Sequence, residues 1–140
     1  MKNGKLSAAV AVATLAASIG FSASPAYAYP TTTFDFAPAY GPGTTAGSVT
    51  WYNRSVAIQG YVYDHNAQIV SPDSTTVRFN FWQGTKDLGT YQTRTASNET
   101  TSFNFTQDGP AGGITVIKVY LCSVPVYPCT YQGNLVRPAS

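Results

Sequence analysis

The chain has few of the side chains that move protons or hold metal ions. Its 140 residues include one histidine, two cysteines and six acidic residues, and charged residues make up 10% of the total. The histidine, His65, lies in the polar stretch Asp64-His65-Asn66, and no Gly-x-Ser-x-Gly sequence supplies a serine nucleophile. Zinc needs more histidines or unpaired cysteines than the chain offers. We therefore expect a protein that is not an enzyme and that holds no metal or cofactor.

The acidic residues are also poorly placed for glycoside hydrolysis, which needs two carboxylates facing each other across a cleft. Five of the six lie in stretches that we interpret as turns or loops, where a carboxylate accepts hydrogen bonds from nearby backbone amides: Asp64, Asp73, Asp87, Glu99 and Asp108. Calcium could use oxygens of Asp64, Asn66 and Asp73, but the Asp-x-Asp-x-Asp-Gly spacing is missing. The acids therefore predict no catalytic pair and no calcium loop.

The first 28 residues have the three parts of a secretory signal peptide. Lys2 and Lys5 give a positive start, residues 6–21 are apolar and uncharged, and Pro25 precedes Ala26-Tyr27-Ala28. The apolar stretch is short for a membrane span, which needs about 20 residues. We expect cleavage after Ala28 and a secreted, extracellular protein of bacterial origin.

The charge balance changes when the signal peptide is removed. Lys2 and Lys5 leave with it, so the eight basic residues fall to six, which equals the number of acidic residues. The six are scattered singly rather than in the basic stripe that phosphate recognition needs: Arg54, Arg78, Lys86, Arg94, Lys118 and Arg137. We expect no binding to nucleic acid, and none to membranes after cleavage.

The two cysteines, Cys122 and Cys129, allow one pairing inside the chain. An exported protein meets an oxidising compartment, so we expect them to form a disulfide around a loop that contains Pro125 and Pro128. A redox-active pair is the alternative, but the Cys-x-x-Cys spacing is absent.

Apolar and polar residues alternate along the chain, as in strands with one face toward a core, and no helical periodicity extends over three turns. The alternation is clear at 48–52, 56–63, 75–82, 101–106 and 114–121, and weaker at 31–36, 88–95 and 130–137. It predicts an all-β protein: an antiparallel β-sandwich of immunoglobulin-like size with seven or eight short strands, at residues 48–140. A small closed barrel is the second possibility. Residues 29–47, rich in Thr, Ala, Pro and Gly, are expected to form a partly flexible arm.

The strands at 48–52 and 56–63 are expected to form a hairpin, although they could lie in opposite sheets. If Trp51 and Ile58 both face the core, the sequence numbers of two residues that pair across the strands must add to an odd sum, as 51 and 58 do. The connection then has an even length, either Arg54-Ser55 or the four residues Asn53–Val56. We favour the four-residue loop because Arg54-Ser55 lacks the Gly or Asn that a two-residue turn prefers.

Three runs carry a resemblance: SVTWYNRSV at 48–56, SFNFT at 102–106, and GIT at 113–115 leading into VYLC at 119–122. With these runs the chain resembles small secreted β-sandwich proteins of actinomycete type. The resemblance implies the fold and the compartment. It implies no activity, because none is established for that group.

Outward-facing aromatic residues are the remaining candidates for function. If Val77, Phe79 and Phe81 point into the core, Arg78 and Trp82 point outward, and we place Tyr52, Tyr61 and Tyr63 outward on neighbouring strands. Exposed aromatics beside Asn and Gln can stack on sugars or contact protein partners, although they could instead cover a second core beneath the arm. We expect a non-catalytic domain that binds an extracellular polysaccharide or a secreted protein. The alternative is a small inhibitor of a secreted hydrolase that uses the Cys122–Cys129 loop.

Overall fold

The computed structural model describes residues 29–39, 43–65, 74–124 and 127–139, and the expected signal peptide lies outside them. The described residues form eight strands and no helix, so none of their segments is a helix able to cross a membrane. The strands are β1 (Thr32–Phe36), β2 (Gly43–Trp51), β3 (Ser55–Asp64), β4 (Ser74–Gln83), β5 (Lys86–Ala96), β6 (Thr100–Asp108), β7 (Val116–Val124) and β8 (Tyr127–Val136).

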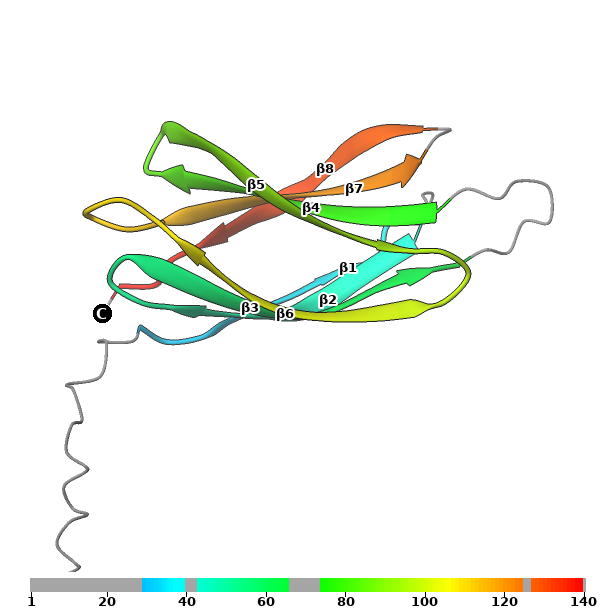
Figure 1. Cartoon of the computed structure of the whole chain (residues 1–140), viewed down its shortest axis with the longest axis horizontal. Helices are drawn as coiled ribbons and strands as arrows, with labels where there is room; N and C mark the ends of the chain where they lie inside the picture. Colours follow the sequence, from blue (N-terminus) through cyan, green and yellow to red (C-terminus); the bar gives the residue numbers. More distant parts are fainter. Residues whose placement is uncertain (1–28, 40–42, 66–73, 125–126, 140) are drawn as a thin grey trace, which may run out of the picture.

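The strands make two antiparallel four-stranded sheets that pack against each other (Figure 1). The first sheet has the order β1-β2-β3-β6 and the second has the order β5-β4-β7-β8. The chain therefore crosses between the sheets after β3, after β5 and after β6. The predicted all-β sandwich is confirmed, and the strand order sets which outward residues can lie side by side.

The core lies between the sheets and consists of the inward residues of the alternating pattern. Phe79 of β4 projects from the second sheet, and its ring lies edge-on to Phe34 at 5.9 Å and to Phe103 at 5.6 Å. Trp51 is fully buried, and its indole nitrogen donates to the hydroxyl of Thr32 at 2.9 Å. The alternation predicted at 48–52, 56–63, 75–82 and 114–121 is confirmed, because large apolar side chains at every second position of β2, β3, β4 and β7 are fully buried: Val49, Trp51, Val56, Ile58, Val62, Val77, Phe79, Phe81, Ile117, Val119 and Leu121.

The β2–β3 hairpin confirms the odd register but corrects the loop. Trp51 pairs with Val56 and Val49 with Ile58, so opposed residues sum to 107 rather than 109. The Tyr52 amide donates to the Ser55 carbonyl at 2.9 Å, which leaves a two-residue turn, Asn53-Arg54. Neither turn residue has a positive φ. The Arg54 guanidinium donates to the Gly109 carbonyl at 3.4 Å, so the β6–β7 connection packs against this turn and supports it.

The described part of the segment predicted to be a partly flexible arm, residues 29–47, contributes strands to the first sheet, and β1 agrees with the weaker strand predicted at 31–36. β1 pairs with β2 from Thr32 to Phe36, and β2 begins at Gly43, five residues before the predicted start. Small residues such as Thr44, Ala46 and Gly47 give no clear apolar alternation, so the sequence pattern hides this half of the strand.

The predicted disulfide between Cys122 and Cys129 is present, with a Cα–Cα distance of 3.9 Å. It joins neighbouring strands, because β7 pairs with β8. The described residues contain no free cysteine. Residues 125 and 126, within the loop that the disulfide closes, lie outside the described residues, so the inhibitor hypothesis stays a prediction.

Candidate functional site

The five predicted binding residues do not form one surface. Tyr61 and Tyr63 lie on the outer face of β3 in the first sheet, whereas Arg78 and Trp82 lie on the outer face of β4 in the second. Tyr52 is half-buried at the β2–β3 turn. The prediction that Arg78 and Trp82 lie on strands next to the three tyrosines is wrong. Because β3 and β4 belong to opposite sheets, the structure separates them by the thickness of the sandwich.

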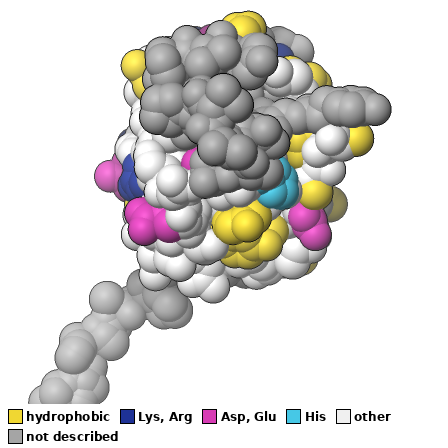
Figure 2. All heavy atoms as spheres, turned by 90° about the vertical axis from the view of Figure 1, so that its right-hand side faces the viewer, with side chains coloured by type: hydrophobic (Ala, Val, Ile, Leu, Met, Phe, Trp, Pro, Cys, Tyr) yellow, Lys and Arg dark blue, Asp and Glu magenta, His cyan; other side chains and the backbone are white. Residues whose placement is uncertain are grey.

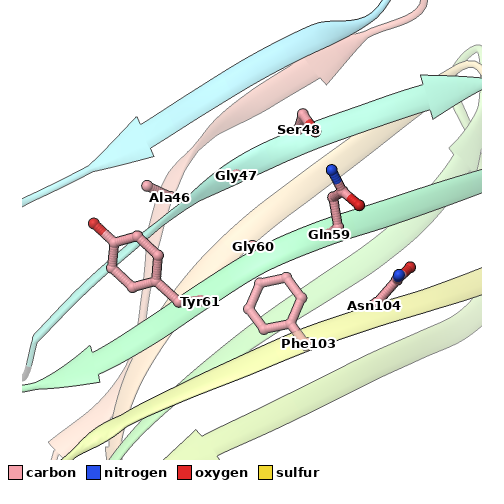
Figure 3. A pocket seen from close by; sticks show the side chains of 8 residues that line it. All are labelled: Ala46, Gly47, Ser48, Gln59, Gly60, Tyr61, Phe103 and Asn104. Atoms are coloured by element: carbon pink, nitrogen blue, oxygen red, sulfur yellow. The ribbon is translucent and has the colours of Figure 1, made fainter.

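Tyr61 borders an open depression of about 400 Å³ on the first sheet (Figure 3). The floor lies where Gly47 of β2 pairs with Gly60 of β3. An added Cβ at Gly60 would collide with the Ala46 carbonyl oxygen, and one at Gly47 would collide with the Gln59 carbonyl oxygen. The two backbones therefore approach too closely for a side chain at either position.

Three neutral polar residues line the depression beside Tyr61. Ser48 pairs with Gln59 across β2 and β3, and Gln59 pairs with Asn104 across β3 and β6. The three side chains therefore form one row on the outer face, and Figure 3 shows them above the sheet. Together they offer one hydroxyl and two amides, which can both donate and accept hydrogen bonds.

The Tyr61 ring has small neighbours on both sides. Ala46 is opposite Tyr61 on β2 and Ser102 is opposite it on β6, and Tyr61 is 39% exposed. No bulky side chain of the adjacent strands can cover the ring from these positions. The ring is therefore available to a flat apolar surface, next to a row of hydrogen-bonding groups.

Tyr63 lies two residues further along β3 and has a partner of its own. Its ring meets His65 edge-on, with 5.2 Å between ring centroids, and both residues are exposed. Figure 2 faces this end of the molecule and shows a histidine beside a group of hydrophobic side chains. No group of three His, Cys, Asp or Glu residues that could hold a metal occurs in the described part of the chain.

Trp82 is less accessible than Tyr61. The Lys118 ammonium lies 3.7 Å from the centroid of its ring, and the indole nitrogen is buried with no hydrogen-bond partner in the described ranges. A ligand could reach the covered face of Trp82 only by displacing Lys118. Arg78 lies 4.2 Å above the ring of Tyr91.

Sequence reasoning found Tyr61 but not the polar residues beside it. Alternation alone places Ser48, Gln59 and Asn104 on outer faces, as it does many other residues. Their common row depends on the pairing of β3 with β6, and two strands of the other sheet separate β3 from β6 in the chain. No local signal in the sequence reports that pairing.

Fold and surface together define a class: an antiparallel β-sandwich with an aromatic and amide-lined depression on one face. The chain matches no protein-family model, no curated protein and no solved structure. The resemblance to actinomycete proteins therefore stays a prediction.

Proposed function

We propose that this protein is a non-catalytic carbohydrate-binding domain and that the depression beside Tyr61 takes a neutral sugar unit. The observation that carries the proposal is an uncovered tyrosine ring next to a row of one hydroxyl and two amides. A pyranose has an apolar face of C–H groups and a rim of hydroxyls. The C–H face can pack on an aromatic ring, and the hydroxyls can form hydrogen bonds with Ser, Gln and Asn.

The lack of charge in the depression supports a neutral ligand. Ser48, Gln59, Tyr61 and Asn104 carry no formal charge, and an uncharged hydroxyl can donate to and accept from each of them. No residue that lines the depression carries a charge, and the nearest acid in the register, Asp35 of β1, pairs with Ala46 at its border. The site is also open, so one unit of a long polysaccharide can enter it while the chain continues on both sides.

The proposal is tested by binding of the purified protein to soluble neutral polysaccharides, namely a β-glucan, a xylan, glycol chitin and dextran. Tyr61→Ala is expected to weaken binding about tenfold because it removes the stacking surface. Tyr61→Phe keeps the ring and should change affinity by about twofold or less. Asn104→Ala should cost about fivefold through a lost hydrogen bond. Affinity is measured by titration calorimetry or affinity gel electrophoresis.

The matched control is Tyr131→Ala, which removes a tyrosine that is 51% exposed on the opposite sheet. It should leave the affinity for the neutral polysaccharide unchanged. Binding that responds to Tyr131→Ala but not to Tyr61→Ala would move the site away from the depression and contradict the proposal.

We also propose that the protein acts outside the cytoplasm after cleavage following Ala28. The disulfide is compatible with an oxidising compartment. The backbone nitrogen of Tyr29 donates to the Trp51 carbonyl at 2.8 Å, and the free amine that cleavage would create can make the same bond. N-terminal sequencing of protein recovered from the culture medium should begin at Tyr29. Full-length protein retained in the cells would contradict this proposal.

A further inference from the structure

The outer face of the second sheet has three rows of residues set by the strand register. The first row runs Asp87, Trp82, Val116 and Val136 across β5, β4, β7 and β8. The second row runs Tyr91, Asn80, Lys118 and Asn134, and the third runs Thr93, Arg78, Tyr120 and Tyr131. We call these three rows the second-sheet face. Both cations lie on its central strands, and aromatic rings surround them.

The two cations of this face, Arg78 and Lys118, have ring contacts but no ion pair with any described residue. The only acid in the three rows is Asp87, and its carboxylate accepts the backbone amide of Gly89 at 2.8 Å. The first sheet's depression has no charge at all. The second-sheet face is therefore a small positive surface with no opposite charge in its centre.

Each cation is held in place by an aromatic ring. Arg78 lies 4.2 Å from the Tyr91 centroid and donates through Nε to Asn80 at 2.8 Å, while Lys118 lies 3.7 Å from the Trp82 centroid. The N–H groups of the two terminal nitrogens of Arg78 remain available to a ligand. A cation that is already positioned loses less side-chain entropy when it binds an anion.

Two exposed rings flank the cations. Tyr91 on β5 is 56% exposed and Tyr131 on β8 is 51% exposed, and β5 and β8 are the two edges of the sheet. Four strands at a spacing of about 4.8 Å place these edges about 14 Å apart. The cations therefore lie between two stacking surfaces that an extended ligand can contact at once.

We propose that the second-sheet face binds an acidic polysaccharide, with Arg78 and Lys118 contacting sugar carboxylates and Tyr91 and Tyr131 packing on sugar rings. A nucleic acid would need more phosphate contacts than two cations supply. An acidic peptide would place its backbone amides against a sheet face whose own backbone groups are paired within the ladders, so those amides would have no partner there. The site is distinct from the depression on the first sheet.

The experiment compares polygalacturonate with fully methyl-esterified polygalacturonate, which has the same backbone without charge. The full chain is expected to bind the acid form at low salt and to bind it more weakly as salt rises. Its Tyr61→Ala variant, which lacks the proposed neutral-sugar surface, is expected to bind the ester at least about tenfold more weakly than the acid form. Arg78→Gln and Lys118→Gln should each weaken binding of the acid form by about tenfold. Arg54→Gln removes the same charge from a turn of the other sheet and should have no effect.

Three results would overturn the proposal: equal affinity of Tyr61→Ala for the acid and its ester, no loss in either Arg78→Gln or Lys118→Gln, or tighter binding to a polyglutamate peptide than to polygalacturonate. Circular dichroism checks that each variant is folded, and the salt dependence of the unmodified protein does not depend on any variant. Tyr61→Ala should leave binding of the acid form unchanged. A failed test of the second-sheet face can therefore be distinguished from a failed test of the depression on the first sheet.

Discussion

Asp64 shows how one buried residue joins distant parts of the chain. It is 5% exposed at the end of β3, where one carboxylate oxygen accepts the Thr75 hydroxyl and the other accepts the Asn98 amide, each at 2.8 Å. Thr75 belongs to β4 of the second sheet, and Asn98 has a φ of 62° in the β5–β6 turn. The sequence predicted Asp64 to be a loop acid that satisfies a backbone amide. It does so, but from a buried position.

We expect Asp64→Ala to lower the free energy of unfolding by about 3 kcal/mol, because it leaves the Asn98 amide and the Thr75 hydroxyl without their acceptor. Asp64→Asn should cost only about 1 kcal/mol. Its oxygen can accept from Asn98, and its amide can donate to the Thr75 hydroxyl, so both bonds persist without the charge. Urea denaturation measures the difference. Equal losses in the two variants would show that the charge, not the acceptor geometry, stabilises the fold.

Among the elements, the β2–β3 pair is the one whose geometry shapes the proposed site. The inner row Phe34, Gly47, Gly60 and Phe103 crosses the first sheet, with two large rings at its ends and two glycines between them. An added Cβ at Gly47 would lie 2.9 Å from the Phe34 ring as well as against backbone. The glycine pair therefore gives space to the core between the two rings.

Gly60→Ala is expected to destabilise the protein by about 2 kcal/mol or more, since the Cβ meets the Ala46 carbonyl, which is backbone and cannot rotate away. Gly84→Ala is the comparison, because Gly84 lies in the β4–β5 turn with a φ of 61° and nothing within 4 Å of an added Cβ. It should cost about 1 kcal/mol from backbone strain alone. Thermal and urea unfolding of both variants measure the two costs. A Gly60→Ala cost no larger than that of Gly84→Ala would mean that the strands can separate.

The sequence pattern predicted most of the strands but not which strands pair with each other. Period-two alternation in β4, with Val77, Phe79 and Phe81 inward, identifies both the strand and its buried face. The partner of a strand depends on contacts between residues far apart in the chain, such as Gln59 with Asn104. The Asn53-Arg54 turn was missed for a related reason, because the β6–β7 connection supports it from outside the hairpin.

The described residues share one core between the two sheets, and neither sheet alone can keep its inner face out of water. Phe79 of the second sheet contacts both Phe34 and Phe103 of the first, and Arg94 of β5 lies 4.3 Å above the ring of Phe105 on β6. Gln92 also donates to Gln107 at 2.9 Å across the same edge. The sheets should therefore unfold together, as expected for a two-state domain of this size.

The disulfide lies within one sheet, so its loss should lower stability without changing that cooperativity. Closing a loop as short as Cys122–Cys129 contributes about 2.5 kcal/mol in the chain-entropy treatment, which is the loss expected for the Cys122→Ser, Cys129→Ser double variant. Replacing Trp51 or Trp82 by Phe leaves a single tryptophan as the reporter of one sheet. Within each variant, the fluorescence and the circular dichroism should report the same midpoint. Two separate midpoints would contradict the single shared core. With one core intact, binding of neutral polysaccharide at Tyr61 should survive the double variant, because no strand of the first sheet carries a cysteine.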